Sequence, residues 1–117
     1  MKYQHLFEPI KVGNKVIKNR IFMPPISTNL ANKGYVTDEL VKHYGDRAKG
    51  GVGLIVSEVV TVEPVYVYLP GDMSIHDDSY MEGWKRYLTK FINMEQFYYL
   101  NYSTLLIWHS RCLEHLN

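Results

Sequence analysis

The sequence of 117 residues has one cysteine, no excess of charge of either sign and no long hydrophobic run. A single cysteine excludes an internal disulfide and a cysteine-based metal or iron–sulfur site. With 13 Lys+Arg against 12 Asp+Glu and no basic block, we expect no nucleic-acid partner. The apolar runs are far shorter than the roughly 20 residues of a membrane span, and the start of the chain lacks a signal-peptide core. We therefore expect a soluble, cytoplasmic protein that does not enter a membrane.

Glycine and proline are missing from the last quarter of the chain, although all eight Gly and five Pro occur before Trp84. Aromatic residues are concentrated there instead, for example at Phe97–Tyr99. The length allows one domain at most, and this break in composition predicts a boundary within it. The five histidines show no metal-ligand spacing, so we expect no metal site.

The first quarter of the chain predicts a hairpin followed by a short strand. Two short alternating runs flank Gly13-Asn14 within residues 9–18, and both turn residues tolerate the positive φ of a tight hairpin. Residues 19–23 form an apolar run that must end at Pro24-Pro25, because proline donates no hydrogen bond to a sheet.

Residues 37–60 predict a helix followed by a buried strand. Thr37 is suited to the N-cap, and Gly50-Gly51 supplies the stop. The run 52–60 is nearly all apolar and β-branched, which is typical of a strand buried on both faces of a parallel sheet. A loop over 64–78 and a second helix from Ser79 follow, with Asp77-Asp78 as the cap. This order is that of an α/β chain, with a β–α spacing close to one eighth of a (β/α)8 barrel of about 250 residues.

Several blocks of sequence, in order and without an evident gap, resemble the start of one enzyme family. They include the stretches LFEPIKVG, KNRIFMPP, GYVTDEL and RAKGGVGLIVSE, which lie at 6–13, 18–25, 34–40 and 47–58. Together they resemble the N-terminus of the Old Yellow Enzyme family. The branch that is most similar is that of the bacterial NADH:flavin oxidoreductases related to 2,4-dienoyl-CoA reductase and enoate reductases.

The resemblance implies both a fold and an activity. It implies an α/β fold in which this chain is the N-terminal part of a TIM barrel, the hairpin plus about two β/α units. The barrel would hold FMN at the carboxyl ends of its strands. FMN would take a hydride from NADH or NADPH and pass it to the β-carbon of an activated alkene, so the implied substrates are small enone or enoyl compounds.

The resemblance also implies part of the flavin site. Pro25, Ile26, Ser27 and Thr28 follow the first barrel strand, where the family cradles the flavin, and Ser27 matches a side chain near the N5–O4 edge. A hydroxyl donor at O4 would stabilise the reduced flavin. Val59 matches a position where the family often has Ala or Gly against the pyrimidine ring, so its branched side chain is a departure. None of the family's catalytic residues falls within this chain.

Some of these residues also have simpler interpretations. Ser27 and Thr28 could cap a turn after the two prolines. Glu58, at the end of the buried strand, is more readily a salt-bridge partner than a catalyst.

The resemblance stops after Phe91-Ile92. The family continues with a Lys-Tyr-Gly-Ala turn and an apolar third strand, whereas this chain continues Asn-Met-Glu-Gln-Phe. A shifted reading frame would restore the family pattern. If the third base of each codon from residue 93 is read with the first two bases of the next codon, the shifted codons are compatible with the Lys-Tyr-Gly-Ala turn and the apolar strand. We therefore expect residues 1–92 to be a fragment of the FMN-binding barrel and residues 93–117 to be an out-of-frame tail. The alternative is that residues 106–111 form the third strand after a short insertion.

Two β/α units cannot close a barrel, and the late-strand glycines and arginine that hold the FMN phosphate in the family are absent. The sequence therefore leaves two functions open. The chain is part of an FMN-dependent NAD(P)H oxidoreductase of the ene-reductase type, or it is a non-enzymatic, inactive remnant of such an enzyme. A third interpretation, a small α/β binding module, has no feature to support it.

Overall fold

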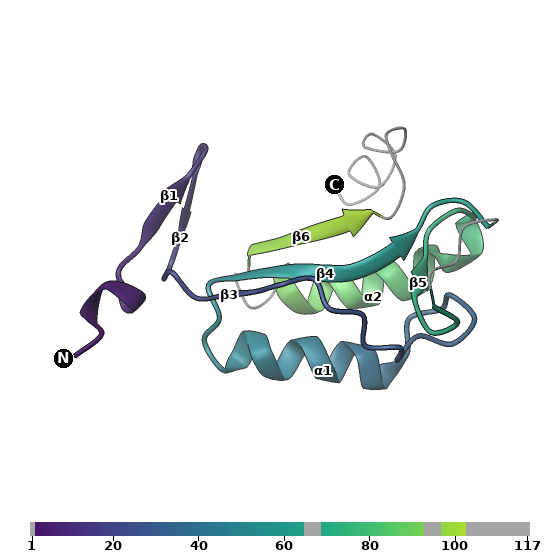
Figure 1. Cartoon of the computed structure of the whole chain (residues 1–117). Coiled ribbons are helices and arrows are strands. Elements are labelled where there is room, and N and C mark those ends of the chain that lie inside the picture. Colours follow the sequence, from purple (N-terminus) through teal and green to yellow (C-terminus); the bar gives the residue numbers. More distant parts are fainter. Residues whose placement is uncertain (1, 65–68, 93–96, 103–117) are drawn as a thin grey trace.

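The computed structural model describes residues 2–64, 69–92 and 97–102. Two helices cover one face of a parallel sheet, and an antiparallel hairpin stands at the N-terminal end of the sheet (Figure 1). This arrangement is the α/β fold that the sequence predicts. The alternative third strand at 106–111 lies outside the described residues.

The hairpin forms where the sequence predicts it, after a 3-10 turn at Gln4–Phe7. Strands β1 (Ile10–Val12) and β2 (Lys15–Ile17) are antiparallel, so Gly13 and Asn14 alone make the turn. Gly13 has a φ of +59°, which is the conformation that the first position of a type II′ turn requires and that glycine adopts without strain. Asn14 was also expected to tolerate a positive φ but does not adopt one.

The strand expected over 19–23 is shorter, because β3 comprises Phe22–Met23 only. The side chain of Asn19 accepts a hydrogen bond from the Ile21 N–H at 3.1 Å and donates to the Gly51 carbonyl at 2.7 Å. These bonds turn the chain and bring it beside the start of the next strand. The approach is close, since a Cβ at Gly53 would stand 2.7 Å from the Asn19 carbonyl oxygen.

Helix α1 (Asp38–Lys49) begins and ends at the predicted signals. The Thr37 hydroxyl accepts a hydrogen bond from the Leu40 N–H at 3.1 Å, which is the N-cap geometry. At the other end the Gly50 N–H donates to the Asp46 carbonyl, and Gly51 adopts a φ of +97°. The helix buries one face, formed by Leu40, Tyr44, Gly45 and Ala48.

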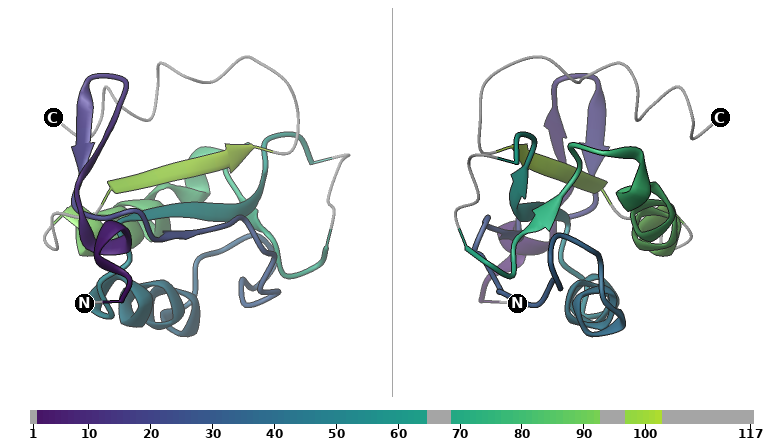
Figure 2. Two further views of the ribbon diagram at one scale, coloured as in Figure 1. Left: turned by 60° about the vertical axis from the view of Figure 1, so that its left-hand side comes forward. Right: turned by 90° about the vertical axis from the view of Figure 1, so that its right-hand side faces the viewer.

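Strand β4 (Leu54–Thr61) is the centre of the sheet, as its apolar run predicts. β3 pairs with it in parallel at Leu54–Ile55, and β6 (Phe97–Tyr102) pairs in parallel along most of its length. Figure 2 shows β6 beside β4 in both views. The register with β6 shifts between Val56 and Val59, which marks a bulge at Ser57-Glu58.

A short strand that the sequence does not predict lies within the expected loop over 64–78. This is β5 (Met73–Ser74), which pairs in parallel with Val60–Thr61. Since β6 pairs with the same part of β4, β5 must occupy the opposite edge, where β3 stops at Pro24. The loop after β4 therefore returns to cover the edge that the two prolines leave unpaired.

The second helix begins with a 3-10 turn at Asp78–Tyr80, followed by α2 (Met81–Ile92). The Asp77 carboxylate accepts a hydrogen bond from the Ser79 N–H at 2.9 Å, which confirms Asp77 as a cap. Trp84, Tyr87 and Phe91 lie on the buried face, with neighbouring rings edge to face. They pack against α1 and the helix-facing residues of β4, such as Ile55 and Val60.

In the part of the chain that the structure describes, no helix lies on the other face of the sheet (Figure 1). Phe22 on β3 is 59% exposed, and Ile26, just beyond the prolines, is 62% exposed. Within the residues that the structure describes, no helix is long and apolar enough to cross a membrane.

Candidate functional site

The segment after β3 runs over the carboxyl end of β4. Because β3 and β4 are parallel and Met23 pairs with Ile55, the chain beyond Pro24-Pro25 continues toward Glu58. The segment after β3 contacts β4 at Thr28, whose N–H donates to Glu58 Oε2 at 2.5 Å. This contact brings the predicted segment 25–28 to the same end of the sheet as Val59.

The predicted site residues differ in exposure. Pro25 and Ile26 are exposed, whereas Ser27, Thr28 and Val59 are partly buried. The Thr28 hydroxyl accepts a hydrogen bond from the Leu30 N–H at 3.3 Å, as the turn interpretation predicts. The Ser27 hydroxyl has no hydrogen-bond partner among the described residues.

Glu58 is the most unusual residue at this end of the sheet, because its carboxylate is fully buried. Oε2 accepts from Thr28, but Oε1 has no hydrogen-bond partner in the described part of the chain. The salt-bridge interpretation is wrong within that part, where the ion pairs are His5–Glu8, Lys42–Asp46 and Arg86–Asp38. Burial raises the pKa of Glu58, and the nearby carboxylate of Asp72 raises it further.

Tyr44 on α1 completes the surroundings of Glu58. Its hydroxyl oxygen accepts a hydrogen bond from the Glu58 N–H at 2.9 Å, inside the core. Burial, and then the charge of Glu58, raise the pKa of the Tyr44 hydroxyl, so it stays protonated. This contact is not predicted from the sequence, although the position of Tyr44 one helical turn after Leu40 is a sign that it faces the sheet.

The loop before β5 is hydrogen-bonded to the segment after β3. The Gly71 N–H donates to Asn29 Oδ1 at 2.8 Å, and the Ala31 N–H donates to the Gly71 carbonyl at 2.9 Å. Asn29 has a φ of +59°, a conformation that asparagine adopts more readily than most residues. Asp72, which is 1% exposed, accepts from the Leu69 N–H at 2.9 Å, and its other oxygen has no partner among the described residues.

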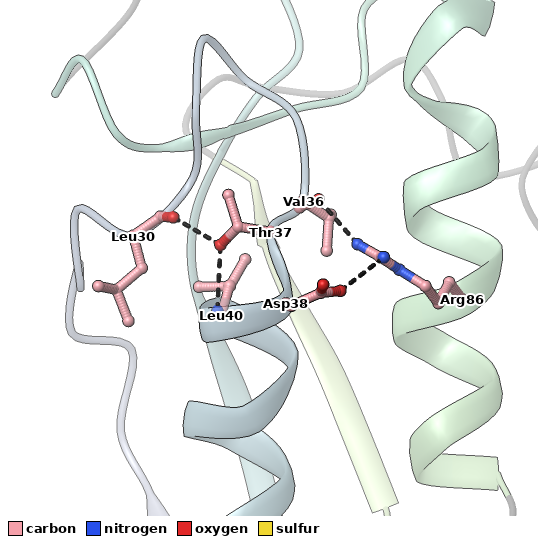
Figure 3. Close-up of polar contacts among 6 residues, drawn as sticks. All are labelled: Leu30, Val36, Thr37, Asp38, Leu40 and Arg86. Atoms are coloured by element: carbon pink, nitrogen blue, oxygen red, sulfur yellow. Dashed lines mark hydrogen bonds and ion pairs between the residues drawn. The ribbon is translucent and has the colours of Figure 1, made fainter.

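The cap of α1 holds the far end of the same segment (Figure 3). The Thr37 hydroxyl donates to the Leu30 carbonyl at 2.7 Å while it accepts from Leu40. Arg86 on α2 donates to Asp38 at 2.6 Å and to the Val36 carbonyl at 3.0 Å. Segment 28–37 is therefore fixed by β4, by the loop before β5 and by both helices.

These residues fit one part of an FMN molecule. The exposed, apolar Ile26 and Ser27, whose hydroxyl has no partner in the described part of the chain, come directly before the backbone anchor at Thr28. This arrangement suits a planar ring with polar edges. Neither the segment after β3 (24–31) nor the one after β4 (62–64) contains lysine or arginine. The phosphate of FMN would thus need groups from outside these two segments.

Comparison with known proteins identifies the family of this chain. Residues 5–98 match the NADH:flavin oxidoreductase / NADH oxidase family. The chain is similar to the NADH oxidase of Thermoanaerobacter brockii, with 46% identity over 83 residues, 69% of this chain and 13% of the relative. It is also similar to a probable flavin mononucleotide-dependent alkene reductase of Leishmania infantum, with 33% identity over 82 residues, 69% of this chain and 22% of the relative.

The fold matches solved structures of the same kind. The old yellow enzyme from Trypanosoma cruzi superposes with a TM-score of 0.77 at 28% identity, over 87% of this chain and 27% of the other. A 2-naphthoyl-CoA reductase complex superposes with a TM-score of 0.80 at 26% identity, over 86% of this chain and 16% of the other. The chain thus spans a small N-terminal part of its relatives. It belongs to the NADH:flavin oxidoreductase / NADH oxidase family, the family of the old yellow enzymes, and has the fold of the N-terminal part of their TIM barrel.

Proposed function

We propose that this chain is the N-terminal part of an FMN-dependent NAD(P)H oxidoreductase of the ene-reductase type. The observation that carries the proposal is the segment Pro25–Thr28, which is presented at the carboxyl end of β3 and tied to the buried Glu58. Active sites of TIM barrels are built at this end of the strands. The family match over residues 5–98 supports a flavin-binding role for this segment.

In this proposal the residues of the chain bind and orient the flavin. FMN supplies the hydride chemistry when it is bound. Ile26 and Val59 contribute apolar surface for the ring, and Ser27 donates its hydroxyl hydrogen to a ring oxygen. Because a hydrogen bond to the developing negative charge stabilises the reduced form, Ser27 raises the tendency of the flavin to accept electrons.

The names of the relatives support the choice of reductant and substrate. One relative is called an NADH oxidase and another an alkene reductase that depends on flavin mononucleotide. We propose NADH or NADPH as the hydride donor and a small activated alkene, an enone or enoyl compound, as the acceptor.

A hybrid protein tests this function. The matching N-terminal segment of the Thermoanaerobacter brockii NADH oxidase is replaced by residues 6–92 of this chain. We expect the hybrid to retain FMN and to oxidise NADH, because the transplanted segment supplies its share of the flavin site. The matched variant Ser27→Ala should retain FMN but be reduced more slowly. A folded hybrid without FMN contradicts the proposal.

A second candidate function concerns the 117-residue chain by itself, as a non-enzymatic remnant. It is supported by the small share of the relatives that the chain covers, 13% and 22% for the two described above. The segments after β3 and β4 also lack cations for the phosphate of FMN. The test is to titrate the purified chain with FMN and then add NADH. Oxidation of NADH would exclude the remnant, and its absence at high micromolar FMN would exclude autonomous activity.

A further inference from the structure

We propose that Glu58 is a positioning residue for the flavin-facing segment, and that its carboxylate holds residues 25–28 in place through the backbone N–H of Thr28. This inference rests on the proposed function, because it gives the held segment its role. Glu58 touches neither the flavin nor the substrate in this proposal.

The geometry places Glu58 beneath the segment. Glu58 lies in the bulge of β4, where its carboxylate is fully buried and Oε2 accepts the Thr28 N–H at 2.5 Å. Thr28 directly follows Ser27, so this bond fixes the backbone beside the hydroxyl that is expected to meet the flavin. The two prolines before it restrict the backbone further. This hydrogen bond therefore ties the segment to the central strand of the sheet.

Burying this carboxylate costs free energy, so packing alone does not explain why a glutamate lies here. A buried carboxylate without a cation is unfavourable, and an apolar side chain would suit the core better. In the described part of the chain no lysine, arginine or histidine forms an ion pair with Glu58. The titratable groups that act on it are Tyr44 from α1 and Asp72 from the loop before β5. Asp72 is itself a buried carboxylate and repels the charge.

The bond to Thr28 consequently depends on the charge of Glu58. A carboxylate accepts a hydrogen bond from an N–H more strongly than a neutral carboxyl group does. When Glu58 takes up a proton, the repulsion by Asp72 is relieved, but the bond to Thr28 becomes weaker. Burial raises the pKa of Glu58, which moves this change upward from its ordinary value of 4.5.

Nuclear magnetic resonance of the full 117-residue chain tests the inference. The readout is the chemical shift of the Thr28 amide proton as the pH is varied, for the unchanged chain, Glu58→Gln and the control Glu63→Gln. Glu63 is exposed just beyond the end of β4. We expect the Thr28 signal to move upfield as the pH falls, with a midpoint above 4.5, in the unchanged chain and in Glu63→Gln. In Glu58→Gln, whose amide imitates the protonated acid, it should not move.

A Thr28 signal that stays constant in the unchanged chain overturns the inference, and this result needs no variant to fold. A pH-dependent movement of the Thr28 signal in Glu58→Gln, equal to that in the unchanged chain, also overturns it.

FMN is then added, and shifts of the amides at 26–28 measure binding. We expect Glu58→Gln to bind FMN roughly tenfold more weakly at neutral pH, the factor for one weakened charged hydrogen bond. Equal binding by both proteins overturns the inference. If FMN moves no signal in the unchanged chain, autonomous FMN binding is excluded, the hybrid protein still tests the proposed function, and the Thr28 titration still decides the role of Glu58.

Discussion

The N–H of Thr28 donates to the carboxylate of Glu58 at 2.5 Å, across 30 residues of sequence. The contact joins the segment after β3 to the middle of β4. It lies between the helix-covered core and the segment that we propose to face FMN. Most of the consequences below follow from this one contact and from the loops that surround it.

The charge of Glu58 should make folding less favourable at neutral pH. Because its folded-state pKa is raised above the unfolded value of 4.5, its contribution to stability is fully present below pH 4.5 and is lost as the pH rises through the folded pKa. Glu58→Gln removes this loss. Urea unfolding at a series of pH values should show the stability of Glu58→Gln relative to the unchanged chain rising over that window and constant below it.

Asp46 and Asp77 have lowered pKa values, because hydrogen bonds from Lys42 and Ser79 favour their charged forms. Their contributions have the opposite sign and are lost at low pH. Because Glu58→Gln and the unchanged chain both contain Asp46 and Asp77, these contributions cancel when the stabilities of the two proteins are subtracted. A pH-independent difference between Glu58→Gln and the unchanged chain would contradict a raised pKa.

Thr37→Ala should destabilise the chain by about 1 kcal/mol or more, because it removes the cap of α1 and also frees the Leu30 carbonyl. Thr37→Ser keeps the hydroxyl and should cost less than about 0.5 kcal/mol. Free energies of unfolding from urea titration measure both. Equal losses for the two variants would show that the methyl group, and not the hydroxyl, matters.

Gly71→Ala should break the hydrogen bonds between the loop before β5 and the segment after β3. A Cβ at Gly71 would stand 2.5 Å from the Asn29 carbonyl oxygen, so the backbone must move and the expected cost is about 1–3 kcal/mol. Gly50→Ala is the matched control, because Gly50 is exposed and has the φ of an ordinary helical residue, −67°. Amide hydrogen exchange at Ala31 should accelerate in Gly71→Ala only. Unchanged exchange there would mean that the loops do not depend on each other.

The tail from residue 93 leads to a prediction about the gene. We propose that residues 93–117 are read out of frame, and that the third base of each codon with the first two of the next encodes Tyr-Gly followed by an apolar strand. The coding DNA from about codon 85 to well beyond codon 117 should be sequenced again. An open frame that continues with this segment supports the proposal. A C at the third base of codon 93, which would give His in place of Tyr, refutes it.

The sequence predicts the elements with strong local signals and misses those that depend on distant partners. The hairpin, the caps at Thr37 and Asp77 and the apolar strand β4 all follow from residues close to one another. β5 was expected to be loop, because it has two residues and exists only by pairing with Val60–Thr61.

In the site too, features with a local sequence signal were predictable and those that depend on distant residues were not. The segment 25–28 could be located by the two prolines and by its resemblance to known enzymes. The role of Glu58 could not, since a glutamate after an apolar run usually indicates an exposed residue. Its partners Thr28, Tyr44 and Asp72 come from three separate parts of the chain. Only their assembly in the fold reveals a buried carboxylate that forms no ion pair with the described residues.

The amount of FMN bound by the hybrid protein tests the central claim most directly. The hybrid carries residues 6–92 of this chain on the remainder of the Thermoanaerobacter brockii NADH oxidase, and its flavin absorbance is compared with its protein concentration. The account predicts close to one FMN per chain and oxidation of NADH. A hybrid that is monodisperse and folded by circular dichroism, but holds no FMN, would contradict the claim that these residues form part of a flavin site.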